Sequence, residues 1–343
     1  MTEESIKIKD KDNLILDIKG LHVEYQTDDG IVYALNDVDI EIEKKETLGL
    51  VGETGAGKTT TGLAILKLIP SPPGVVKSGN ILLDNENLGE LSEKRMEEIR
   101  GNDVSMIFQD PMTALNPVMT VETQIAEVIE FHEKNGQKDA LKKAHEILEL
   151  VGIPAARGNE YPHQFSGGMK QRVVIAIALA CKPRLLIADE PTTALDVTIQ
   201  AQVLKMMKDL KVHYDTSMLM ITHDLGIVAE VCDRVAIMYA GRIIEMGNLV
   251  DVFDNTRHPY TEGLFNSLPN LKNRTAKLKP IKGLMPDPMN LPTGCPFHPR
   301  CNYATDICNQ KMPGKVYRTD SHYVRCHLYD AESIKNGGKI ERG

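Results

Sequence analysis

The hydrophobic pattern of the first fifty residues predicts β-strands. Short runs rich in β-branched residues span positions 14–18, 21–25 and 38–42, and an Asp-Asp-Gly sequence at 28–30 gives a strong turn signal between them. We therefore expect an antiparallel β layer at the start of the chain.

Residues 120–151 show the spacing of amphipathic helices instead. Apolar residues recur at intervals of three and four, and an Asn135-Gly136 pair interrupts the pattern. The recurring apolar positions are Val121, Ile125, Val128, Ile129, Leu141, Ala144, Ile147, Leu148 and Val151. This spacing predicts a mostly helical insertion, which we place at residues 110–170.

Further apolar runs indicate a sheet that is buried on both faces. Residues 47–51, 185–189 and 217–222 are short and almost wholly apolar, as the strands of a mainly parallel sheet are. Residues 234–239 and 242–246 flank an Ala-Gly pair and predict a hairpin. The chain is therefore expected to have an α/β fold.

The pattern changes again after residue 255. Its periodicity fades, and nine of the eighteen prolines lie between Pro259 and Pro313. We expect a charged N-terminal tail, a main domain, a small cysteine-rich domain and a charged C-terminal tail, at residues 1–13, 14–254, 255–330 and 331–343.

A complete phosphate-binding loop of the form G-x-x-x-x-G-K-[ST] lies between the apolar run at 47–51 and an amphipathic stretch that starts at Leu63. A strand that enters a helix through a glycine-rich turn directs backbone N–H groups and the helix dipole at one point, where a polyphosphate binds. Lys58 is expected to reach the β- and γ-phosphates, and Thr59 to ligate Mg²⁺. The loop residues expected to bind ATP are Gly52, Glu53, Thr54, Gly55, Ala56, Gly57, Lys58, Thr59 and Thr60.

Two carboxylates, Asp189 and Glu190, emerge together at the end of the apolar run 185–188, where ligand sites form in α/β sheets. We expect Asp189 to hold Mg²⁺ and Glu190 to polarise the water that attacks the γ-phosphate. The alternative is a solvated acidic loop, which the upstream phosphate loop disfavours.

A second helix start with N–H donors is predicted at Ser166-Gly167-Gly168, just before a helix at 173–180. By itself such a sequence is often only a helix cap. Its position between the phosphate loop and the two carboxylates favours a phosphate-binding role.

Three side chains at strand ends complete the candidate site. Gln109 could contact Mg²⁺ or the attacking water, His223 the γ-phosphate, and Tyr25 an adenine ring. Each has an ordinary alternative, namely a surface glutamine, a packed or solvated histidine, and an edge-strand aromatic that packs on its own sheet.

The order of these motifs resembles that of the nucleotide-binding subunits of ATP-binding-cassette (ABC) transporters across residues 14–250. The Phe-Ser-Gly-Gly-Met-Lys-Gln-Arg sequence at 165–172, the sequence at 189–202 and the His-Pro-Tyr-Thr sequence at 258–261 look like those of dipeptide and oligopeptide permease ATPases. Met169 replaces the glutamine that is commonest in the wider family, and it is usual in one of the two ATPase subunits of these permeases. The resemblance therefore implies a different chain as partner.

The resemblance also implies a P-loop ABC-type fold with a RecA-like core, an antiparallel β subdomain and a helical subdomain. It implies a head-to-tail dimer, in which the Ser-Gly-Gly helix of one chain closes ATP on the phosphate loop of the other. It assigns Asp196, in the sequence Ala194-Leu195-Asp196, to the dimer interface. Gln109 is assigned to signalling toward membrane subunits, and His223 to a switch that contacts the γ-phosphate.

Composition limits the partners of the chain. The formal net charge of −8 over 343 residues, with a pI of about 5.7, leaves no basic surplus for nucleic acid. No apolar run approaches the ~20 residues of a membrane-spanning helix, and the first residues lack a signal-peptide core. We therefore expect the chain to stay in the cytosol, and the resemblance implies a peripheral position on the cytoplasmic face of the membrane. The resemblance supplies two transmembrane permease subunits as partners and, indirectly, an extracytoplasmic solute-binding protein.

Four of the six cysteines crowd into the C-terminal segment with the spacing C-x5-C-x6-C-x17-C, at Cys295, Cys301, Cys308 and Cys326. Four thiolates suit either zinc or a [4Fe-4S] cluster, and the spacing alone leaves the metal open. The resemblance implies [4Fe-4S], because permease ATPases with the sequence Cys-Pro-Phe-His-Pro-Arg-Cys and two further cysteines bind that cluster. Unliganded thiols or a disulfide remain alternatives, as does zinc with or without ligands from His298, His322 and His327.

Together these features predict an ATPase subunit that powers the import of di- or oligopeptides. A nickel or other small-solute importer would share the same motifs. A soluble ABC ATPase acting on DNA or ribosomes would carry long heptad arms or two tandem cassettes, whereas roughly 130 residues separate Lys58 from Asp189 here without sustained heptads. An ATP-binding iron–sulfur sensor without turnover is disfavoured by Glu190 and His223.

Overall fold

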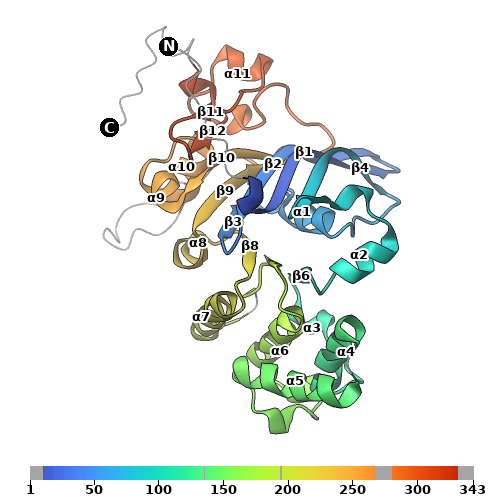
Figure 1. Ribbon diagram of the computed structural model, residues 1–343. Coiled ribbons are helices and arrows are strands. Elements are labelled where there is room, and N and C mark those ends of the chain that lie inside the picture. Colours follow the sequence, from blue (N-terminus) through green and yellow to red (C-terminus); the bar gives the residue numbers. More distant parts are fainter. Residues whose placement is uncertain (1–10, 135, 194, 268–279, 331–343) are drawn as a thin grey trace.

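The structure is a computed structural model of the chain, and it describes residues 11–134, 136–193, 195–267 and 280–330. Residues 1–10 and 331–343 of the predicted tails lie outside the described residues, as do Asn135 and Ala194. Figure 1 shows two sheets in the middle of the molecule, a group of helices at one end and the C-terminal segment at the other.

The first sheet is antiparallel and has the strand order β2-β1-β4-β5. Its long strands bury alternate apolar side chains such as Leu16 and Ile18, which is the pattern of a sheet with one face on the core. The predicted runs 14–18 and 21–25 form one strand, with irregular pairing between them. The four strands are Leu14–Thr27 (β1), Gly30–Glu43 (β2), Gly74–Leu83 (β4) and Glu86–Asn87 (β5).

The second sheet has eight strands in the order β11-β12-β10-β9-β3-β8-β7-β6. Strands β3 and β6 to β9 run parallel, which confirms the buried strands predicted from their apolar runs, and β9 and β10 form the predicted hairpin. The strands are Thr47–Val51 (β3), Val104–Ile107 (β6), Leu185–Asp189 (β7), Ser217–Thr222 (β8), Arg234–Tyr239 (β9), Arg242–Asn248 (β10), Val316–Tyr317 (β11) and Tyr323–Val324 (β12).

Helices α3 to α6 gather at one end of the molecule (Figure 1). Helices α4 and α5 pack against each other, and the predicted apolar positions Ile125, Ala144 and Leu148 lie in one buried cluster. The helices predicted within 120–151 are therefore confirmed, and the bounds of the insertion at 110–170 stay a prediction. The helices of this group are Pro111–Ala114 (α3), Val121–Glu133 (α4), Gln137–Leu150 (α5) and Gly167–Leu179 (α6). The helices beside the sheets are Lys58–Ile65 (α1), Glu93–Ile99 (α2), Val197–His213 (α7) and Leu225–Val231 (α8).

The C-terminal segment is tied to the main sheet. Strand β12 pairs with β10, and Tyr260 and Phe297 belong to the same buried cluster as the central strands. The placement of a domain boundary at residue 255 stays a prediction. The helices here are Leu249–Asp254 (α9), Pro259–Asn266 (α10) and Asp306–Gln310 (α11). Of the helices in the described part, none is both long enough and apolar enough to cross a membrane.

Candidate nucleotide-binding site

The phosphate loop connects the fully buried strand β3 to helix α1. Gly57 is the N-cap of helix α1 and has a φ of 104°. Because glycine provides no side-chain acceptor, the first N–H groups of the helix can donate to a bound ligand instead. A Cβ atom at Gly52 would lie 2.3 Å from the carbonyl oxygen of Met238, and one at Gly57 would lie 2.7 Å from that of Ala34. Both positions therefore require glycine.

Lys58 is almost fully buried beneath this loop. Its Nζ donates to the carbonyl oxygens of Gly52 at 2.8 Å and Glu53 at 3.0 Å. Burial lowers the pKa of Lys58, against the opposing charges of Glu190, Asp189 and Glu53. The ammonium group thus sits inside the loop, close to the two carboxylates that follow β7.

Asp189 and Thr59 form the candidate magnesium pair. Asp189 is buried at the end of β7, and its carboxylate is hydrogen-bonded to the Thr59 side chain. Burial raises the pKa of Asp189, and Thr59 and Lys58 oppose that shift. A carboxylate and a hydroxyl that face each other are oxygen donors of the type that Mg²⁺ prefers.

Glu190 joins the other predicted catalytic residues. Its Oε1 lies 2.9 Å from Nδ1 of His223, and its Oε2 accepts from Nε2 of Gln109 and from Oγ1 of Thr193, each at 3.1 Å. Three strand ends, at β6, β7 and β8, therefore bring Gln109, Glu190 and His223 together around one carboxylate.

The backbone of Glu190 is unusual, and its surroundings keep its side chain ionised. Its φ of 47° lies in the left-handed region, which a non-glycine residue occupies at a cost of about 1 to 3 kcal/mol and which is common at functional sites. Burial acts to raise the pKa of Glu190, but the bond and the charge of His223, together with Thr193 and Lys58, outweigh it and lower the pKa. The carboxylate therefore stays ionised near neutral pH.

One cavity of about 350 Å³ collects most of the predicted nucleotide-binding residues. The predicted residues that line it are Tyr25, Thr54, Gly55, Gly57, Lys58, Thr59, Thr60, Gln109, Glu190 and His223. Its remaining walls are Val32, Ala34 and Pro288, which sequence reasoning missed because they belong to no motif. Of the other loop residues, Gly52 and Ala56 are buried in the turn itself.

The structure does not bring Ser166, Gly167, Gly168 and Asp196 to this cavity. Ser166 caps helix α6 by accepting from the N–H of Met169 at 3.4 Å, and Asp196 caps helix α7. A Cβ atom at Gly168 would lie 2.6 Å from Cγ2 of Ile199, so the starts of the two helices pack against each other. The Ser-Gly-Gly motif thus lies beside Asp196 at the starts of α6 and α7, outside this cavity.

The sequence matches two family models, one described as ABC transporter over residues 35–193 and one as oligopeptide/dipeptide transporter, C-terminal region, over residues 244–308. The oligopeptide transport ATP-binding protein OppD of Bacillus subtilis is 52% identical over 324 residues, which are 94% of this chain and 90% of that protein. The chain belongs to the ATP-binding proteins of the ABC transporter family. The dipeptide transport ATP-binding protein DppD of the same organism is 50% identical, over 92% of this chain and 95% of that protein.

Solved structures agree with membership of the ABC transporter family. The ATP-binding cassette MJ0796, solved as a dimer in a post-hydrolysis state bound to ADP and Pi, matches with a TM-score of 0.61 and 27% identity over 68% of this chain and 98% of that one. CbiO1 of Clostridium perfringens, part of the ABC transporter complex cbiONQ, matches with a TM-score of 0.61 and 28% identity over 71% and 91%. The chain therefore has the P-loop ABC ATPase fold, to which ATP and Mg²⁺ fit.

The four C-terminal cysteines lie near one another as free thiols. Burial raises the pKa of Cys326 to about 12, and the charges of Cys295, Cys301 and Cys308 act in the same direction. Within the described part of the chain, however, no group of three or more Cys, His, Asp or Glu side chains could hold a metal ion as arranged. The predicted iron–sulfur cluster is therefore unsupported by the side-chain arrangement.

The histidines considered as zinc ligands have other partners. Nδ1 of His298 lies 2.9 Å from the carbonyl oxygen of Cys295, and Nε2 of His322 lies 2.9 Å from Oε1 of Glu245. Both ring nitrogens of His327 are also engaged, with Asp330 and the carbonyl of Lys311. These contacts disfavour a zinc site built with histidine.

Proposed function

We propose that this chain is the ATP-hydrolysing subunit of an ABC importer of di- and oligopeptides. The observation that carries the proposal is the meeting of Lys58, Thr59 and Glu190 at one cavity, with Asp189 buried behind it and hydrogen-bonded to Thr59. The strong similarity to peptide transport ATP-binding proteins along nearly the whole chain supports the peptide substrate.

The residues at this site have different roles in the proposed ATP hydrolysis. Mg²⁺, when bound, supplies charge that neutralises the phosphate oxygens, and Thr59 and Asp189 would hold it. Lys58 binds the β- and γ-phosphates. Glu190, kept ionised by its surroundings, accepts a proton from the attacking water, while Gln109 and His223 hold its two oxygens in place.

A head-to-tail dimer completes this site in the proposal. Ser166 and Asp196 lie outside the cavity of their own chain, and Val197 beside Asp196 is 82% exposed. A second chain that presents the same face would bring its helix N-terminus to the phosphates. We propose a second, different ATPase subunit as partner, with a homodimer as the alternative.

An apolar groove next to Gln109 is the proposed docking site for the permease subunits. The groove, about 420 Å³, lies between β6 and α4 and exposes the rings of Phe108 and Phe131 together with Leu68. Phe108 directly precedes Gln109, which is hydrogen-bonded to Glu190. A permease helix bound in this groove would therefore influence the position of Glu190. This docking would place the chain on the cytoplasmic face of the membrane, where it meets the solute-binding protein only indirectly.

Phe131→Ser tests this docking site. We expect the variant to lose assembly with its permease, measured by co-purification, and to keep the nucleotide affinity of the isolated chain. Val118→Ser, at a position that is 78% exposed and outside the groove, is the matched control. Normal assembly of Phe131→Ser would contradict the placement.

The cysteine-rich segment at 255–330 is the proposed site of a [4Fe-4S] cluster. Three of the four thiols accept backbone N–H groups two residues ahead, at Phe297, Tyr303 and Leu328, and such bonds to sulfur are a feature of cluster environments. Iron and acid-labile sulfide analysis of anaerobically purified protein tests the proposal. About four of each per chain would support the cluster, and zinc or no metal would reject it.

The transport proposal is tested by reconstitution of the chain with its permease subunits, partner ATPase and binding protein in vesicles. Peptides of two to five residues should stimulate ATP hydrolysis and accumulate inside, whereas Ni²⁺ should do neither. Stimulation by Ni²⁺ alone would establish the small-solute importer. ATP binding without hydrolysis in the full assembly would instead favour an ATP-binding sensor.

A further inference from the structure

Glu53, the second residue of the phosphate loop, is held by the C-terminal segment. The guanidinium group of Arg300 donates to both carboxylate oxygens of Glu53, from Nη1 to Oε2 at 2.7 Å and from Nη2 to Oε1 at 3.1 Å. Such a two-point pair is stronger and more directional than a single ion contact. Across 247 residues of sequence, Arg300 thus fixes the side chain of a loop residue.

The backbone of Glu53 is held as well. Its N–H donates to the hydroxyl of Tyr260 at 3.0 Å, and its carbonyl oxygen accepts from Nζ of Lys58 at 3.0 Å. All three polar groups of Glu53 therefore have protein partners, and two of those partners, Arg300 and Tyr260, come from outside the nucleotide-binding motifs.

The two anchors are themselves rigid. The side chain of Arg300 is only 7% exposed, and it also donates from Nε to the carbonyl of Lys282 at 3.0 Å and from Nη1 to the hydroxyl of Tyr239 at 3.3 Å. Tyr260 is fully buried, with its ring 4.6 Å from that of Tyr239 and 5.5 Å from that of Phe297. Packed aromatic rings of this kind leave the Tyr260 hydroxyl little freedom to move.

We propose that Arg300 and Tyr260 are positioning residues that hold the phosphate loop in its ATP-binding conformation through Glu53. If the loop adopts other conformations, its apparent affinity for ATP equals the intrinsic affinity multiplied by the fraction of molecules in the ATP-binding conformation. Contacts that raise this fraction therefore raise the apparent affinity. The inference rests on the proposed ATPase function, because it assumes that the loop binds ATP. It makes the C-terminal segment part of the nucleotide site.

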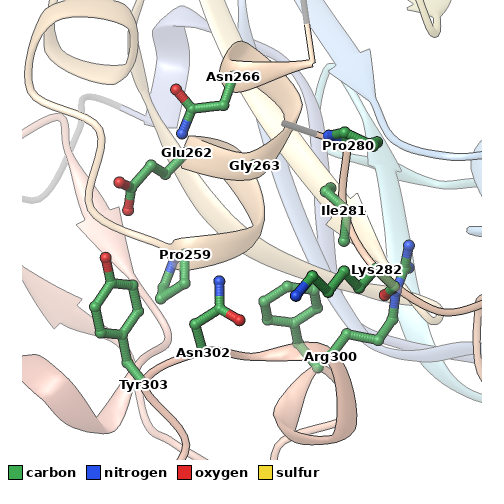
Figure 2. A pocket seen from close by; sticks show the side chains of 11 residues that line it. Pro259, Glu262, Gly263, Asn266, Pro280, Ile281, Lys282, Arg300, Asn302 and Tyr303 are labelled. Carbon is green, nitrogen blue, oxygen red and sulfur yellow. The ribbon is translucent and has the colours of Figure 1, made fainter. Parts of the chain in front are cut away.

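The surroundings of Arg300 permit substitution. Arg300 borders a cavity of about 490 Å³ that is also lined by Lys282, Glu262 and Asn302, and Figure 2 shows these side chains around the open space. A different side chain at position 300 can therefore extend into this cavity without a steric clash. Arg300→Gln and Arg300→Lys are both suitable variants.

The test measures the affinity of the full chain for a non-hydrolysable ATP analogue by calorimetry, and kcat and KM in the assembled transporter. Arg300→Gln should weaken binding about tenfold and raise KM while kcat changes little, because the anchor acts on the free loop more than on the transition state. Arg300→Lys should recover part of the affinity, since it keeps the charge but not the two-point geometry. Tyr260→Phe, which removes only the hydroxyl, should weaken binding in the same direction.

Two controls and one cycle separate positioning from general damage. Arg95→Gln breaks a comparable pair with Glu86 away from the loop, and it should leave affinity unchanged. Tyr323→Phe removes a buried hydroxyl that has no hydrogen-bond partner among the described residues, and it should also leave the affinity for the ATP analogue unchanged. In the Glu53→Gln background, Arg300→Gln should add little further loss, because the two residues act through one contact.

Several outcomes would overturn the proposal. These are wild-type affinity in both Arg300→Gln and Tyr260→Phe, tighter binding in either, or fully additive losses for Glu53→Gln and Arg300→Gln. Should Arg300→Gln fail to fold, Tyr260→Phe and the Glu53→Gln variant carry the same test. Failure of the wild-type chain itself to bind the analogue would contradict the ATPase assignment instead, so the two failures are distinguishable.

Discussion

Glu190 and His223 lie 33 positions apart in sequence, yet their Oε1 and Nδ1 atoms are 2.9 Å from each other. The contact exists because β7 and β8 are parallel neighbours that end at the same edge of the sheet. The carboxylate is thereby oriented from one side by His223 and from the other by Gln109. Any change at Glu190 is therefore expected to affect chemistry more than binding.

Glu190→Gln tests the role of this carboxylate directly. The amide keeps the shape of the side chain but cannot accept a proton from water, so we expect kcat to fall by about 10²- to 10⁴-fold. ATP binding should persist, and dimers that retain ATP should accumulate on size-exclusion chromatography. Glu98→Gln, at an exposed site on α2, is the control. Unchanged turnover in Glu190→Gln would reject the assigned role.

Ser166→Arg should separate binding from hydrolysis in a different way. Ser166 lies outside the nucleotide cavity of its own chain, so the isolated variant should bind ATP with wild-type affinity. In the assembled transporter, a bulky cation at this helix start would obstruct the site of the partner chain, and hydrolysis should fall at least tenfold. A loss of nucleotide binding by the isolated variant would contradict the shared-site dimer.

Gly52→Ala is expected to disrupt the loop itself. The added Cβ would lie 2.3 Å from the backbone carbonyl oxygen of Met238. Because the clash is with a backbone atom, no side-chain rotation can remove it. We expect the loss of ATP binding and a lower midpoint of thermal unfolding. Gly314→Ala, at a position with open space around it, should change neither quantity. ATP binding by Gly52→Ala at wild-type affinity would show that the loop can shift without cost.

Local sequence signals predicted the parts of the site that follow single strands. The phosphate loop after β3 and the carboxylates after β7 each carry their signal in a few adjacent residues, and the parallel sheet brings them together. The contacts of Arg300 and Tyr260 with Glu53 carry no such signal, because an arginine in a proline-rich segment has many possible partners.

Two very short strands were missed in the fold. Strands β11 and β12 contain two residues each, too few to show an alternating pattern, so their addition to the main sheet was not predicted. The Ser-Gly-Gly motif was predicted to precede a helix at 173–180, but the helix begins at Gly167, so the two glycines form its first turn. The role of this motif at the site of a second chain stays a prediction.

His258 should make the stability of the chain depend on pH. It is completely buried, accepts a hydrogen bond from the N–H of Tyr260 at 3.0 Å, and burial lowers its pKa from 6.5 to about 4, against the charge of Glu245. The unfolded chain therefore binds more protons than the folded chain between these two values. The contribution of His258 is complete above pH 6.5 and is lost as the pH falls toward 4, with a slope of up to about 1.4 kcal/mol per pH unit.

His258→Asn removes this titration and keeps a side chain that can cap helix α10. Between pH 7 and pH 5 the wild-type free energy of unfolding should fall by about 2 kcal/mol more than that of the variant. Urea denaturation followed by circular dichroism at both pH values measures the difference. Because other groups titrate in the same range, only the difference between the two proteins counts. An equal loss in both would mean that the pKa of His258 is the same in the folded and unfolded chains, and that the buried network around Glu245 accommodates its charge.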